Sequence, residues 1–317
     1  MDFAFSDGVA LGGECRRVAG EEVAAAISRL ADFHEDPDLA IHEVRKHNKR
    51  IRSVLLLSGS ALDPDDLART NRLVRDAARL FSGARDAFVL QDTCDKLAAR
   101  FPEDAGDVLH LLQKVRDTFA ERHAACLHDR ELPGKIARAC EHFREAGENI
   151  ARWDWEQVTR EEIFRAILSH YQRGFSDFET ARRSRDPEDC HDWRKRTKAL
   201  SYHLTLLAPL DVEGREGVEK QALAAGELAS SLGEHHDLAV FEEAVGEGVD
   251  RGVFPEAARL LPALAAKRRD ELEEGIFASG RVLYRDFAPS LRRFLHCLLA
   301  GMVMICVGGC ESFLSPD

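Results

Sequence analysis

The sequence has few runs of β-branched or aromatic residues, and no segment of it is a convincing candidate for a β-strand. Leu, Ala, Glu and Arg dominate instead, and all four favour helices. Short breaks at Pro and Gly separate segments whose apolar residues recur at three- and four-residue spacing, the pattern of amphipathic helices. The sequence therefore predicts an all-α protein.

Long apolar segments are also missing. The most apolar stretch, from Phe294 to Val307, has 14 residues, whereas a transmembrane helix needs about 20. We expect a buried terminal helix there and no membrane association. The N-terminus shows no signal peptide pattern, and the eight cysteines form no C-x-x-C pair, as is typical of scattered thiols in a reducing compartment. A cytoplasmic location is the resulting expectation.

The common catalytic motifs are absent as well. The sequence has no P-loop, no Rossmann glycine pattern, no G-x-S-x-G and no zinc-finger spacing. We therefore predict no enzymatic activity, no catalytic residue, no metal site and no cofactor. One alternative stays open, because His236-Asp237 resembles the two-residue core of HD-type metal-dependent phosphohydrolases.

The segment Ile41–Leu57 places most of its positive charge on one side of a predicted helix. An arc of about 160°, at about 100° per residue, holds His42, Arg45, Lys46, Lys49, Arg50 and Arg52. Glu43 is the one acid in this segment. Because like charges at this spacing repel, the face predicts an anionic ligand. The net charge of −12 argues against general nucleic-acid binding and favours a confined anion site.

The same pattern recurs 149 residues later in the chain. The second copy consists of His191, Arg194, Lys195 and Lys198. Asp86 and Asp237 also match, at a separation of 151 residues. A near-constant separation of two motifs indicates an internal repeat. It predicts two bundles of about four helices each, related by a pseudo-twofold axis, at residues 1–155 and 156–300, with a tail at 301–317.

If the repeats face each other, the two basic faces line one shared site. Arginine offers forked donors that suit phosphate oxygens, and lysine a compact charge. Arg50 and Arg52 extend the first face to about 15 Å, which suits a polymer. Ala199 and Ser201 hold those positions in the second copy, although Tyr202 stays on its basic face. The first helix is expected to be the more cationic half of the site.

These motifs resemble the CHAD domain family, the conserved histidine α-helical domain. IHEVRKHNKRIR (41–52) is similar to the family's helix pattern throughout, and CHDWRKRTKALSY (190–202) to its first eight motif positions. GARDAFVL and GEHHDLAVF resemble a second family segment, and the resemblance covers roughly residues 10–297. It implies two four-helix bundles around a basic groove or pore that binds inorganic polyphosphate, in association with polyphosphate granules.

The resemblance also implies which residues contact phosphate. The main group is His42, Arg45, Lys46, Lys49, Arg50, Arg52, His191, Arg194, Lys195, Lys198 and Tyr202. Second-rank candidates are Arg16, Arg17, Arg85, His236 and Lys267. A further alternative stays open, in which a helical scaffold binds an acidic protein or nucleic acid through the same faces.

Overall fold

The computed structural model describes residues 3–59, 61–102, 106–211 and 213–306. Within these ranges the chain forms α-helices, two short 3₁₀ helices and no strand, which confirms the all-α class. The helices are α1 (Leu11–Ala31), α2 (Pro37–Ser58), α3 (Pro64–Arg79), α4 (Ser82–Arg100), α5 (Asp107–Leu127), α6 (Leu132–Arg152), α7 (Arg160–Ser184), α8 (Pro187–Leu207), α9 (Arg215–Asp250) and α10 (Leu260–Cys306).

Three helices, including both basic ones, begin with the dipeptide Asp-Pro. The aspartates Asp36, Asp63 and Asp186 cap α2, α3 and α8. Each carboxylate accepts a hydrogen bond from a backbone N–H of the first turn, and each proline occupies the first helical position. Proline has no N–H to leave unpaired there, and the cap satisfies one that would otherwise be unpaired. The Asp-Pro pairs therefore fix where the two basic helices begin.

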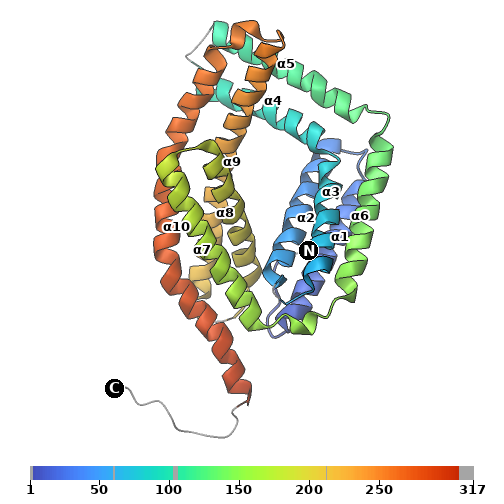
Figure 1. Ribbon diagram of the computed structural model, residues 1–317, viewed down its shortest axis with the longest axis vertical. Coiled ribbons are helices and arrows are strands. Elements are labelled where there is room, and N and C mark those ends of the chain that lie inside the picture. The colour runs from blue at the N-terminus through green and yellow to red at the C-terminus, as the bar shows by residue number, and fades with distance from the viewer. Residues whose placement is uncertain (1–2, 60, 103–105, 212, 307–317) are drawn as a thin grey trace.

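The helices form two groups that meet at both ends of the molecule (Figure 1). One group consists of α1, α2, α3 and α6, and the other of α7, α8, α9 and α10. At one end α4 and α5 leave the first group and pack against α9 and α10. At the other end α2 contacts α7 and α8.

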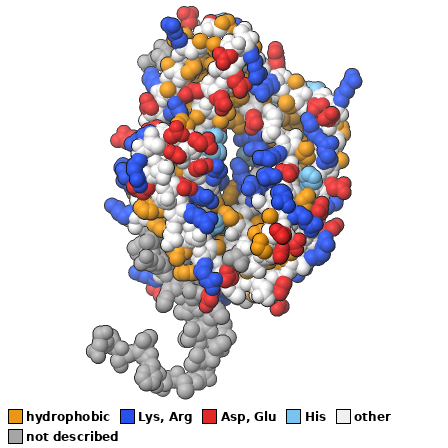
Figure 2. Space-filling model, viewed as in Figure 1, with side chains coloured by type: hydrophobic (Ala, Val, Ile, Leu, Met, Phe, Trp, Pro, Cys, Tyr) orange, Lys and Arg blue, Asp and Glu red, His pale blue; other side chains and the backbone are white. Residues whose placement is uncertain are grey.

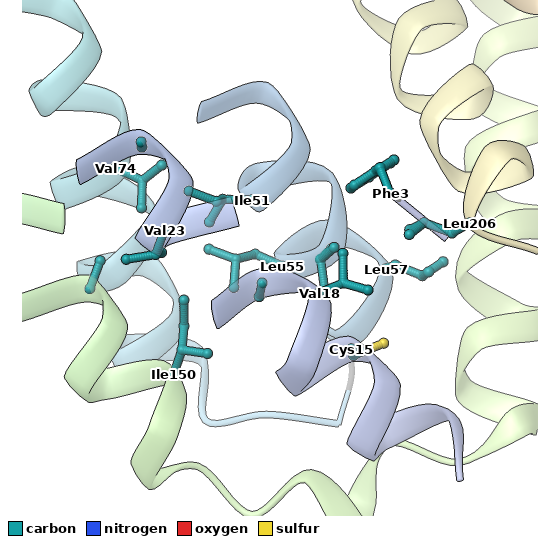
Figure 3. Packing of buried hydrophobic residues seen from close by; sticks show 14 of the residues in the cluster. Phe3, Cys15, Val18, Val23, Ile51, Leu55, Leu57, Val74, Ile150 and Leu206 are labelled. Atoms are coloured by element: carbon teal, nitrogen blue, oxygen red, sulfur yellow. The ribbon is translucent and has the colours of Figure 1, made fainter. Parts of the chain in front are cut away.

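The buried apolar residues form three clusters. The first combines α1, α2, α3 and α6 with the end of α8, so that Leu206 lies near Phe3 and Leu57 (Figure 3). The second joins α4 and α5 to α9 and α10, and the third surrounds Trp193 in the second group. The first two clusters contain residues from both 1–155 and 156–300. The division of the chain at residue 155 stays a prediction.

The apolar stretch that begins at Phe294 is helical, as expected, up to the end of α10 at Cys306. Phe294 itself is buried against Gly214, the residue before α9. Val307 and the remainder of the predicted tail lie outside the described residues. Among the described helices, none combines the length and the apolarity that crossing a bilayer requires.

A buried histidine joins the two basic helices. His203 of α8 is inaccessible to solvent, and its Nε2 donates to the backbone carbonyl of Ser53 in α2 over 3.1 Å. Burial lowers the pKa of His203 to about 3, and neighbouring His170 lowers it further in the same direction. The neutral ring therefore acts as a fixed hydrogen-bond donor between α2 and α8.

A buried network of ionisable groups fixes α2 against α1. The Glu22 carboxylate accepts a hydrogen bond from Arg50 Nη1 at 3.0 Å and contacts His47 Nδ1 at 2.5 Å. The Glu22 side chain is 7% exposed and that of Arg50 22%. Because an ionised group in such a place needs a partner, this network sets the orientation of α2 about its axis.

We expect Glu22→Gln to destabilise the fold by about 3 kcal/mol, because it leaves the Arg50 charge without its anionic partner. Urea denaturation measures the change. Glu21→Gln is the matched control: Glu21 pairs with Arg17 on the more exposed side of the same helix, and its loss should cost at most about 1 kcal/mol. Equal losses in the two variants would contradict the role of the network.

Candidate functional site

Cationic side chains of α2 and α8 lie close together between the two groups of helices. Figure 2 shows Lys and Arg side chains gathered beside a hollow in this face of the molecule. Arg45 and Lys49 of α2 lie within electrostatic range of Arg194 on α8. Burial lowers the pKa of Lys198 on α8, and the charges of Arg194 and Arg50 in turn lower it further. The structure therefore brings the centres of the two repeated motifs together.

The positive charges at the centre of this cluster repel one another. Partial burial, followed by Arg194, Arg45, Lys198 and Arg85, lowers the pKa of Lys49 to about 8. The pKa of Arg45 is also lowered, chiefly by burial, and Asp86 offsets part of that change. Among the described residues, no carboxylate forms an ion pair with Arg45, Lys49, Arg194 or Lys198. The centre therefore holds an excess of positive charge, which Asp86 and Asp237 offset only in part.

The outer lysine of each motif is neutralised within its own helix. Lys46 Nζ lies 3.1 Å from a Glu43 carboxylate oxygen, and Lys195 forms the equivalent ion pair with Asp192. Both acids directly follow the motif histidine. Sequence reasoning missed this second repeated feature, although the equal spacing of Glu43 and Asp192 was available as a signal. These two lysines therefore contribute less net charge than the central ones.

The pKa values of the histidines in the site are lowered, which favours their neutral form in the free protein. His191 stacks on His236, with ring centroids 3.8 Å apart and an angle of 26° between the planes. Burial, then His191 and Arg194, lowers the pKa of His236 to about 4. The pKa of His42 is lowered by burial and by Arg85. A bound anion would raise these pKa values and favour rings with two donors.

The two arginines at the edges of the first basic face point away from each other. Arg50 turns toward Glu22 and lies over the ring of Phe3, at 4.8 Å from its centroid. Arg52 Nε donates to Asn71 Oδ1 at 2.9 Å and lies near Arg75 and Arg79 of α3. The two positions are about 160° apart around the helix, so the two side chains cannot both face one ligand. Arg50 stays beside the cluster, and Arg52 lies outside it.

The second-rank candidates divide into two kinds. Arg85 of α4 lies in the cluster, since its charge acts on His42, Arg45 and Lys49, and His236 joins it through His191. Arg17 is held by Glu14, Glu21 and the Ala4 carbonyl.

The remaining two second-rank candidates lie elsewhere. Lys267 lies over the ring of Phe101, at 4.4 Å from its centroid, where α10 meets the end of α4. Arg16 is exposed on α1, and no described interaction links it to the cluster.

Tyr202 and the two repeated aspartates complete the surroundings. The Tyr202 ring lies beneath Lys198 Nζ at 4.9 Å, and burial raises its pKa, so that the hydroxyl keeps its proton and can donate. Asp86 and Asp237 act electrostatically on Arg45 and Arg194 respectively. Arg194, Lys96 and Arg85 all lie within electrostatic range of Asp237. Across the residues that the structure describes, no three His, Cys, Asp or Glu side chains are grouped so as to hold a metal ion.

Comparison with known proteins gives one result about the family. No curated protein matches the chain. The family model of the CHAD domain matches residues 17–246, a span that contains both basic motifs and both aspartate segments. Arg16 and Lys267 fall outside it. The match covers well over half of the chain, and the protein belongs to the CHAD domain family.

Proposed function

We propose that this protein binds inorganic polyphosphate, without catalysing its turnover, in a basic groove lined by α2 and α8. The observation that carries the proposal is the excess positive charge of four cations that form no ion pair, Arg45, Lys49, Arg194 and Lys198. Holding these cations together costs free energy in the absence of an anion. A ligand with closely spaced negative charges recovers that free energy on binding, and the CHAD family is associated with polyphosphate.

The spacing of the helices supports a groove between two facing repeats. The starts of α1, α2, α3 and α5 precede those of α7, α8, α9 and α10 by 149 to 153 residues. Under this alignment, α2 corresponds to α8, and α3 with α4 corresponds to α9. The contacts of α2 with α8 and of α4 with α9 then join equivalent elements across a pseudo-twofold axis. In such an arrangement both basic motifs can contact the same ligand.

The charge distribution favours a slender phosphate polymer over a nucleic acid. The protein carries a net charge of −12, so its surface outside the cluster repels large polyanions that make long-range contacts. A linear polyphosphate presents its charge without bases or sugars and fits a confined site. Forked guanidinium groups such as Arg45 and Arg194 suit its oxygens. We further propose that the protein acts in the cytoplasm, at polyphosphate granules.

Charge reversal of the two central arginines tests the site. We expect Arg45→Glu with Arg194→Glu to weaken binding of a labelled polyphosphate by more than about 100-fold, because each change replaces a charge-assisted hydrogen bond with repulsion. Fluorescence anisotropy measures the affinity. Arg165→Glu with Arg251→Glu makes the same change in net charge at exposed positions and should have little effect. Unchanged binding in the first double variant would refute the assignment.

The pH dependence of binding should trace to Lys49. In the free protein its pKa is about 8, and a bound polyanion raises this value, so binding near pH 8 takes up a proton and weakens as the pH rises above 8. We expect Lys49→Arg to keep binding and to remove most of this dependence, because arginine does not titrate there. Calorimetry in two buffers of different ionisation enthalpy measures the proton uptake. The same uptake in the variant would contradict the prediction.

A comparison of two arginines separates the cluster from the wider basic face. We expect Arg85→Gln to weaken polyphosphate binding by about 10-fold and Arg52→Gln by less than about threefold, because only Arg85 adds its charge to the cluster. The two variants remove the same charge. Titrations at one ionic strength give the ratio, and a larger loss in Arg52→Gln would place the ligand along α3 instead.

A further inference from the structure

The four lysines of the two motifs differ in what surrounds their amines. Three have a partner: Lys46 pairs with Glu43, Lys195 with Asp192, and Lys198 lies over the ring of Tyr202. In the part of the chain that the structure describes, Lys49 has neither a carboxylate nor an aromatic ring as a partner. Neighbouring side chains cover part of Lys49, but the residue as a whole is solvent-exposed, so a reagent in solution can reach it.

Cations from three helices lie within electrostatic range of the Lys49 amine. Arg45 lies one turn earlier on α2, Arg194 and Lys198 lie on α8, and Arg85 lies on α4. Together with burial they lower the pKa of Lys49 to about 8. About half of this amine is unprotonated at pH 8, compared with well under about 1% of an ordinary lysine. The unprotonated form is the nucleophile.

We propose that Lys49 is a covalent modification site that acyl phosphates acylate, and that its acylation weakens anion binding by the cluster. The inference rests on the proposed function, because the cations that would hold polyphosphate would also hold the phosphate group of the acyl donor. Arg45 and Arg194 offer forked donors to the phosphate oxygens and stabilise the departing phosphate.

The reaction needs no other reagent. The lone pair of the Lys49 nitrogen attacks the acyl carbon, and the bond from that carbon to the bridging oxygen breaks. Inorganic phosphate leaves with the electron pair of that bond, and the nitrogen releases one proton to solvent. The product is a neutral amide. It removes the Lys49 charge from the centre of the cluster and with it part of the attraction for any polyanion.

The test is the rate at which each lysine of the full chain reacts with acetyl phosphate at pH 8, followed by peptide mass spectrometry. Lys49 should react about 10-fold faster than Lys46, Lys195 and Lys198. Its roughly 100-fold larger fraction of free amine is partly offset by lower basicity. Tripolyphosphate should slow acetylation of Lys49 but not of Lys220 on the surface. In Lys49→Arg no other lysine should take over the fast rate. Acetylation of Lys49 at the rate of Lys220 would overturn the proposal.

A second acyl donor tests recognition of the phosphate group, and a polyphosphate-binding assay separates the modification site from the proposed function. With p-nitrophenyl acetate, which carries no phosphate, the preference for Lys49 should be smaller. An equal or larger preference would overturn recognition of the phosphate group. Slow acetylation in protein that binds polyphosphate would refute this inference alone. Fast, selective acetylation in protein that does not bind polyphosphate would refute the proposed function and leave the modification site in place.

Discussion

The fold must hold four like-charged side chains close together. These are Arg45, Lys49, Arg194 and Lys198, and their electrostatic repulsion opposes the packing of α2 against α8. Four cations from two helices share a partly desolvated space, and the pKa of each is lowered. Such repulsion would separate two isolated helices. The fold keeps α2 and α8 in contact through apolar packing and through the hydrogen bond from His203 to Ser53. The stability of the core therefore maintains a site that is unfavourable without a ligand.

The remaining charges are arranged so that the repulsion stays local. Glu43 and Asp192 each neutralise the outer lysine of their own motif, and Glu22 neutralises Arg50 at the edge. Asp86 and Asp237 act electrostatically on the two central arginines without forming ion pairs with them. These acids confine the excess charge to the centre of the cluster. A ligand that spans only this centre meets most of the available attraction, which fits a narrow polymer better than a broad surface.

Much of this arrangement follows from the sequence, because local rules govern most of it. The Asp-Pro caps define where three helices begin, and the repeated motif identifies the residues that meet. The sequence does not show that Arg50 contacts Glu22 of α1 whereas Arg52 contacts Asn71 of α3. In the sequence both arginines belong to one basic arc of about 160°, and only the packing of α1 and α3 against α2 separates them. The length of α9 also cannot be predicted from the sequence, because a glycine usually indicates a helix break. Gly233 instead lies inside α9, where the Arg194 side chain packs against it. Tertiary contacts decide both features.

Thermal unfolding with and without ligand is the direct measurement of whether a phosphate polymer neutralises this cluster. A ligand that binds the folded state alone raises the midpoint of unfolding by an amount that grows with its affinity and its concentration. We expect a rise in Tm with polyphosphate that grows with chain length until the site is filled, and a much smaller rise with single-stranded DNA of equal total charge. No rise with polyphosphate, or an equal rise with both polymers, would contradict it.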